Sequence, residues 1–211
     1  MAVTRNFERR KRDKGNKKKF PFVIIGCEGN SNNKTEKTYF TNFISRKCII
    51  KFSKGNSTDP VGIVEDLLSF IKNEIELEDD DKVYAVFDTD VNPEKQQLID
   101  EAKKLANENG VEIITSTPSF ELWFLLHFGY TTKMFTSNND LQNELMKHIE
   151  NYSKNGNTYR QIKDMTEQAI EDARRLEKYQ IENGQALDNV NCNPYTAVYK
   201  VVEELIKRNK E

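Results

Sequence analysis

The chain has 211 residues and a mass of 24.6 kDa, which suits one domain with an appended helical lobe. No stretch approaches the roughly 20 apolar residues of a membrane-spanning helix, and the basic start of the chain lacks the apolar region of a signal peptide. The three cysteines lie far apart without a C-x-x-C pair, so neither a disulfide framework nor a structural zinc site is indicated. We therefore expect a cytoplasmic protein that does not bind membranes.

The first 20 residues are strongly basic, although the whole chain has a net charge of only −2. They contain nine basic and two acidic side chains. Such an arm can contact the phosphate backbone of a nucleic acid, or it can be a solvated tail that keeps the protein soluble. The candidates for nucleic-acid binding in this arm are Arg9, Arg10, Lys17, Lys18 and Lys19.

From residue 22 to residue 115, apolar strands alternate with amphipathic helices. The pattern predicts strands at 22–27, 47–53, 82–88 and 111–115, and helices at 35–46, 60–75 and 93–107. The near-continuous apolar run at 82–88 is typical of a strand with both faces covered. We therefore predict an α/β fold with a mostly parallel sheet flanked by helices and joined by right-handed crossovers.

Beyond residue 116 the pattern becomes helical, at about 118–128, 138–151, 158–181 and 195–209. Thr117 is placed to cap the first of these helices, with Pro118 at its first position, and Pro194 is placed in the first turn of the last. We divide the chain into a basic arm (1–20), an α/β core (21–130) and a C-terminal helical part (131–211) that packs on the core.

Acidic residues follow two of the predicted strands. Glu28 comes directly after the first strand, Asp88 ends a later one, and Asp90 lies two positions further on. The functional crevice of a parallel sheet lies outside the carboxyl ends of its strands, and residues i and i+2 of an extended chain point the same way. Three carboxylates there repel one another unless a cation such as Mg²⁺ neutralises them. The alternative for the two aspartates is an ordinary turn that ends the strand.

A strand followed by Glu-Gly and a helix, and then a strand followed by D-x-D, resembles the Toprim arrangement of topoisomerases, primases and OLD-family nucleases. In addition, four segments in order are similar to the RloB family of phage-defence proteins, also called the AbiLii type. These segments are "IIGCEGNSNNKTEKTYF", "VFDTDVN", "TPSFELWFLLHF" and "NPYTAVYKVV". The resemblance runs from about Phe22 to Val202.

The resemblance implies a role for each matching acid. Glu28 becomes a general base or metal ligand, and Asp88 and Asp90 become ligands of Mg²⁺ or Mn²⁺. Glu36 corresponds to the second acid of the family's C-E-G-x-x-T-E run, but "NSNNK" lengthens the intervening loop in this chain. Alternatively, Glu36 is a first-turn glutamate stabilised by the helix dipole.

Further candidates lie in the helical part of the sequence. Glu121 is a candidate catalytic residue, either as an additional metal ligand or as an orienting acid near the crevice. For the other residues a packing or solvated role is the alternative to a site role. They are His127 as a phosphate contact or proton carrier, Asn193 and Thr196 at the border of a substrate groove, and Tyr159, Arg160 and Lys163 along a nucleic-acid strand.

The function that we predict is a Mg²⁺-dependent Toprim-type endonuclease that hydrolyses phosphodiester bonds as an abortive-infection effector, with RNA such as tRNA favoured over DNA. One-ion and two-ion schemes are both open. The resemblance implies an ABC-like ATPase partner encoded nearby, which must be another polypeptide because this chain has no G-x-x-x-x-G-K-[ST] sequence. A homo-oligomer is compatible with the sequence. The alternatives are a non-catalytic subunit that binds nucleic acid or the ATPase, a DNA-cleaving nuclease, and a phosphoryl-transfer enzyme on small nucleotides.

Overall fold

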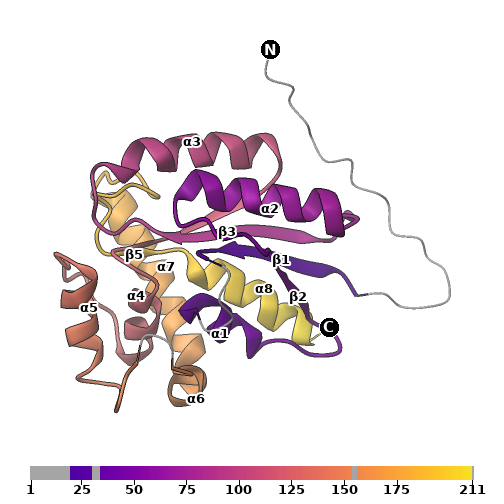
Figure 1. The fold of residues 1–211 in the computed structure, drawn as a ribbon. Helices are drawn as coiled ribbons and strands as arrows, with labels where there is room; N and C mark the ends of the chain where they lie inside the picture. The colour runs from indigo at the N-terminus through magenta and orange to yellow at the C-terminus, as the bar shows by residue number, and fades with distance from the viewer. Residues whose placement is uncertain (1–19, 30–33, 154–155, 211) are drawn as a thin grey trace.

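The computed structural model describes residues 20–29, 34–153 and 156–210, so the basic arm up to residue 19 lies outside the described residues. The strands are β1 (Phe22–Cys27), β2 (Ile49–Phe52), β3 (Lys82–Asp88), β4 (Glu112–Thr117) and β5 (Tyr195–Thr196). They form one sheet in the order β2-β1-β3-β4-β5, in which only β5 is antiparallel to its neighbour (Figure 1). The predicted α/β fold with a mostly parallel sheet is confirmed.

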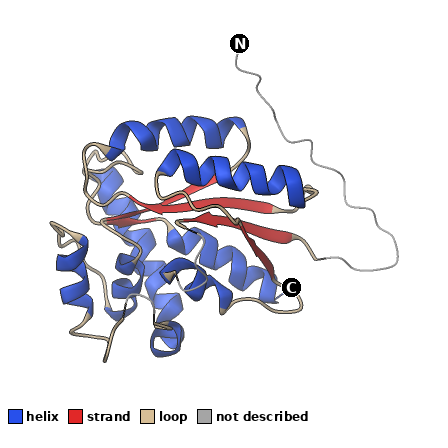
Figure 2. Ribbon diagram, viewed as in Figure 1, coloured by secondary structure: helices blue, strands red, loops and turns tan. Residues whose placement is uncertain are grey.

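Helices cover both faces of the sheet (Figure 2). The helices are α1 (Thr35–Thr41), α2 (Pro60–Glu74), α3 (Lys95–Glu108), α4 (Glu121–Leu125), α5 (Asn138–Leu145), α6 (Tyr159–Ile162), α7 (Thr166–Glu182) and α8 (Val198–Lys210). Two 3₁₀ turns, η1 (Leu126–Phe128) and η2 (Lys163–Met165), continue α4 and α6. Figure 1 shows α2 and α3 on one face and α1, α7 and α8 on the other.

The alternation of side chains along β3 explains this three-layer arrangement. Val83, Ala85 and Phe87 belong to the core under α2 and α3, whereas Tyr84 and Val86 belong to the core on the opposite face. Because successive side chains of a strand point to opposite faces, a strand covered on both sides must be apolar at every position. This is why the sequence already defines the bounds of β1 and β3.

Several predicted helix boundaries are wrong. Thr117 is the last residue of β4 rather than an N-cap, and α4 begins only at Glu121. Tyr195 and Thr196 form β5 rather than the start of a helix, because they pair with Thr117 and Ser116 at the edge of β4. The helix predicted at 158–181 is divided into α6, η2 and α7, and α1 and α5 end earlier than predicted.

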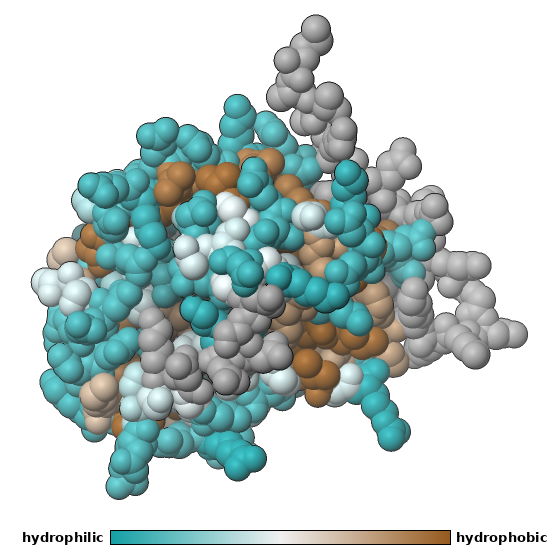
Figure 3. Space-filling model, in the orientation of Figure 1, coloured by the Kyte–Doolittle hydropathy of each residue, from teal (hydrophilic) through white to brown (hydrophobic). Residues whose placement is uncertain are grey.

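One hydrophobic core continues from the sheet into the C-terminal helices. Ile25 of β1, Trp123 of α4, Leu176 of α7 and Val201 of α8 all belong to it. The face drawn in Figure 3 is mainly hydrophilic, with hydrophobic side chains visible in patches between polar ones. None of the helices in the described part of the chain is long and apolar enough to cross a lipid bilayer.

Candidate functional site

The candidate site lies where three neighbouring strands end. Because β1, β3 and β4 are adjacent and parallel, their carboxyl ends meet at the same edge of the sheet. Glu28 follows β1, Asp88 is the last residue of β3, and Glu121 begins the helix after β4. This is the edge at which parallel sheets place their ligand-binding crevices.

The turn after β1 brings the start of α1 toward this edge. Gly29 has a positive φ of 64°, which a residue without a side chain adopts at little cost. Its carbonyl oxygen accepts a hydrogen bond of 2.8 Å from the buried Nζ of Lys37, and its amide donates to the carbonyl oxygen of Ser57 at 3.0 Å. Glu36, in the first turn of α1, is 8% exposed, whereas Glu28 is half-buried.

Asp88 points to the same face of the sheet as α1 and α4. It lies two and four positions after Val86 and Tyr84, whose side chains belong to the core that contains residues of these two helices. In the sheet register Asp88 lies opposite Ser116, which in turn lies opposite Thr196. The strand therefore directs its terminal carboxylate toward the acids of the neighbouring helices.

The pKa of Asp88 is raised well above its ordinary value, and the causes identify its neighbours. Removal of the carboxyl group from water contributes most. The like charges of four other carboxylates add to this effect, in the decreasing order Glu36, Glu121, Glu28 and Asp90. Four acids are therefore close enough to Asp88 for their charges to act on it, and sequence analysis had singled out all four as candidates.

Asp90 reaches this group by a different route from the predicted one. β3 ends at Asp88, and Asp90 has a left-handed φ of 56°, so the extended backbone on which the i and i+2 argument depends does not continue through Asp90. Instead, the amide of Asp90 donates to the carbonyl oxygen of Pro118 at 3.0 Å. Its carboxylate forms an ion pair with Lys95 and accepts a hydrogen bond of 2.8 Å from Nδ2 of Asn138.

Glu121 is a buried carboxylate with three side-chain donors. It is 1% exposed, and it accepts hydrogen bonds from Ser119 at 2.7 Å, Tyr152 at 3.0 Å and Gln142 at 3.4 Å. These donors replace the water that the carboxylate loses on burial. Burial, followed by the charges of Glu121, Glu36 and Asp88, raises the pKa of Tyr152, so this hydroxyl stays protonated and can donate.

The donor set at this edge fits a hard divalent cation in its chemistry. Mg²⁺ and Mn²⁺ prefer carboxylate oxygens and water, and an acid with a raised pKa among four others is one whose negative charge a cation would stabilise. In the part of the chain that the structure describes, no three His, Cys, Asp or Glu side chains are already spaced to hold a metal ion. Asp90 is instead paired with Lys95, whose ammonium group neutralises its charge.

A comparison with protein families matches residues 23–205 to the family described as RloB-like protein. The match covers most of the chain and includes the strands, α1 and α4, which carry the acidic site. The chain belongs to the RloB-like family. We found no match among curated proteins and none among solved structures.

In this RloB-like chain, His127 packs inside the molecule. It is 2% exposed, its Nδ1 lies 2.8 Å from the carbonyl oxygen of Trp123, and its ring contacts the Trp123 ring edge to face. Burial lowers its pKa to about 4, so the imidazole is neutral at pH 7. These contacts favour the packing interpretation over a phosphate contact.

In the RloB-like fold, Asn193 bonds to the backbone of another segment, and Thr196 contacts the neighbouring strand. The Asn193 amide bonds to both backbone groups of Phe135, accepting at 3.2 Å and donating at 2.7 Å. The hydroxyl groups of Thr196 and Ser116 are 2.9 Å apart and buried. Both residues therefore stabilise the segments around the site, and Thr196 does so in the same sheet row as Asp88.

The candidates for nucleic-acid contact are only partly placed. Arg9, Arg10, Lys17, Lys18 and Lys19 lie outside the described residues. Arg160 and Lys163 are exposed on α6 and η2. Tyr159 is not presented for base stacking, because its ring packs edge to face against Tyr39 and Phe43 at centroid distances of 5.7 and 5.3 Å.

Polar residues that contact the acids of this RloB-like site but were not anticipated from the sequence include Ser119, two positions before Glu121. Four others are Lys95, Asn138, Gln142 and Tyr152. Lys95 carried a weak signal, because it begins the helix that follows D-x-D. The other three lie 21 to 48 positions from the acids that they contact, on segments whose pattern resembles a solvated helix face or loop.

Proposed function

We propose that this protein is a Mg²⁺-dependent nuclease of the Toprim type that hydrolyses phosphodiester bonds, with RNA such as tRNA as substrate. The single observation that carries the proposal is that β1, β3 and β4 end at the same edge of the sheet, where the charges of four other carboxylates contribute to raising the pKa of Asp88. Perturbed acids of this kind concentrate at functional sites. Membership of the RloB-like family supports the same role.

In the proposed reaction, Asp88, Asp90 and Glu28 hold the cation. When bound, the cation supplies a Lewis acid for a phosphate oxygen and lowers the pKa of a water molecule. Glu28 is half-buried, so it can exchange a proton with solvent. Glu121 is buried and fixed by its three donors, which suits an orienting acid rather than a mobile proton carrier.

The biological setting is part of the same proposal. We propose an abortive-infection effector that works with an ABC-like ATPase encoded nearby, since the chain lacks a phosphate-binding G-x-x-x-x-G-K-[ST] sequence of its own. The basic arm before residue 20 and the exposed Arg160 and Lys163 would contact the phosphate backbone. Such contacts weaken as the salt concentration rises.

The test incubates the full chain and Mg²⁺ with labelled tRNA, plasmid DNA and free nucleotides. We expect cleavage of tRNA that requires Mg²⁺ and is lost in Asp88→Asn and Asp90→Asn. Asp100→Asn is the matched control, because Asp100 is an exposed aspartate on α3 outside the site. Cleavage of plasmid alone would indicate that the substrate is DNA. Turnover of free nucleotides alone would indicate a phosphoryl-transfer enzyme instead of a nuclease.

One observation favours a second candidate, a non-catalytic subunit that binds nucleic acid or the ATPase. Lys95 pairs with Asp90, and no three acidic side chains among the described residues are spaced to hold a metal. An acid cluster balanced by lysines can be structural. Expression of the double variant Asp88→Asn, Asp90→Asn in cells separates the two, because unchanged toxicity is expected only from the non-catalytic subunit.

A further inference from the structure

Helix α5 contacts the acidic site through two amide side chains. Asn138, its first residue, donates from Nδ2 to Asp90 at 2.8 Å, and Gln142 donates to Glu121 at 3.4 Å. The two acids come from different parts of the sheet, since Asp90 follows β3 and Glu121 follows β4. α5 therefore contacts side chains that follow two neighbouring strands.

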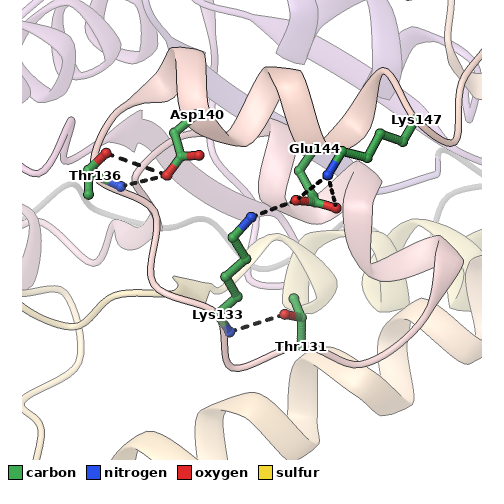
Figure 4. A network of polar contacts seen from close by, with 6 residues as sticks. All are labelled: Thr131, Lys133, Thr136, Asp140, Glu144 and Lys147. Carbon is green, nitrogen blue, oxygen red and sulfur yellow. Dashed lines mark hydrogen bonds and ion pairs between the residues drawn. The ribbon is translucent and has the colours of Figure 1, made fainter.

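The opposite face of α5 is fixed to the loop that precedes it (Figure 4). Positions 138 and 142 lie one helical turn apart on one side, and positions 140 and 144 lie on the other. Asp140 accepts from the backbone amide of Thr136 at 3.1 Å, and Glu144 forms ion pairs with Lys133 and Lys147. With contacts on both faces, the helix is a fixed support rather than a free lobe.

The amide of Asn138 donates a hydrogen bond through its nitrogen, but within the described part of the chain its oxygen accepts none. Its oxygen, Oδ1, is buried and has no hydrogen-bond partner among the described residues. Amide oxygens are hard ligands of the kind that Ca²⁺ accepts in proteins. The same amide therefore donates to Asp90 and carries an unused oxygen beside it.

We propose that α5 is the positioning element of the acidic site, with Asn138 orienting Asp90 and Gln142 orienting Glu121 for a divalent cation. This inference rests on the proposed function, which requires that cation. A neutral amide orients a carboxylate without cancelling its charge, whereas the ammonium group of Lys95 does cancel it. Gln142 therefore leaves the charge of Glu121 available to a cation. Asp90 becomes available only when Lys95 moves away, and Asn138 then holds its carboxylate in place.

The first experiment measures Mn²⁺ binding to the full chain by isothermal titration calorimetry. We expect Asn138→Ala and Gln142→Ala to bind Mn²⁺ about tenfold more weakly than the wild type, the usual effect of losing a partner that orients a ligand. Asn139→Ala is the matched control, because Asn139 is an exposed amide at the next position of α5. Unchanged affinity in both amide variants would overturn the inference.

A second variant separates positioning from plain stabilisation of the helix. Asn138→Asp places a carboxylate against Asp90, so the cation-free protein should melt at a lower temperature, and saturating Mn²⁺ should raise its Tm more than it raises that of the wild type. If Asn138 only stabilises the helix, the Tm of the cation-free variant should be lowered, but Mn²⁺ should raise it by the same amount as in the wild type. That result would contradict a positioning role.

If the wild type itself binds no Mn²⁺, the proposed function fails and this inference with it. If the wild type binds and the variants bind equally well, only this inference fails.

Discussion

Asp88 is the residue on which the site depends. Asp88 is half-buried at the end of a buried strand. Partial removal from water, together with the charges of four other acids, raises its pKa. Repulsion among these carboxylates lowers the stability of the fold unless a positive charge balances it. Perturbation by burial together with specific like charges is typical of functional groups, although structural ion networks produce it as well.

Replacement of Asp88 by Asn should stabilise the cation-free protein. The folded pKa of Asp88 lies above its ordinary value of 3.8, so the ionised side chain destabilises the folded state, and this cost disappears as the pH falls below the folded pKa. We expect Asp88→Asn to raise the free energy of unfolding at pH 8, because the neutral amide is not repelled by the neighbouring carboxylates. Urea unfolding at pH 8, 6 and 4 measures the gain.

The gain of Asp88→Asn should shrink toward pH 4, where the wild-type side chain becomes neutral too. Asp100→Asn serves again as the exposed control and should show no comparable pH-dependent gain. A variant that is less stable than the wild type at pH 8, or a gain that is independent of pH, would show that Asp88 is a structural partner instead.

At the scale of elements, the sequence predicted those whose cause is local. β1, β3 and α2 were recognised because continuous apolar runs and the Asp59–Pro60 start are visible in the chain itself, and Asp59 does cap α2 through a 2.9 Å bond to the amide of Gly62. β5 could not be recognised in the same way. Its two residues are a strand only because the edge of β4 is there to pair with them.

The aromatic residues of α4 and its preceding turn should act through packing. Phe124 is 2% exposed and contacts Phe120 and Tyr39 at ring-centroid distances of 5.4 and 5.5 Å. We expect Phe124→Ala to lower the free energy of unfolding by about 3–5 kcal/mol, because a large buried ring leaves a cavity. Chemical denaturation measures the loss. Met146→Ala, at a side chain that is 52% exposed, should change stability by less than about 0.5 kcal/mol. A loss below about 1 kcal/mol for Phe124→Ala would contradict the packing role.

At the scale of the whole molecule, the sequence predicted which acids are brought together but not how they are held. Parallel strands deliver Glu28 and Asp88 to one edge by topology, which a sequence pattern can indicate. The contacts of Asn138 with Asp90 and of Tyr152 with Glu121 join residues 48 and 31 positions apart. Such contacts depend on how the C-terminal helices pack, and the periodicity of the sequence does not reveal that packing.

The central claim is that acids from separate strand ends form one cation site, and crystals soaked in Mn²⁺ test it most directly. We predict anomalous density at about the 2–2.6 Å coordination distances of divalent cations from the carboxylate oxygens of Asp88 and Glu28, with Lys95 displaced from Asp90. No anomalous density at this edge under saturating Mn²⁺, with the ion pair between Lys95 and Asp90 intact, would contradict it.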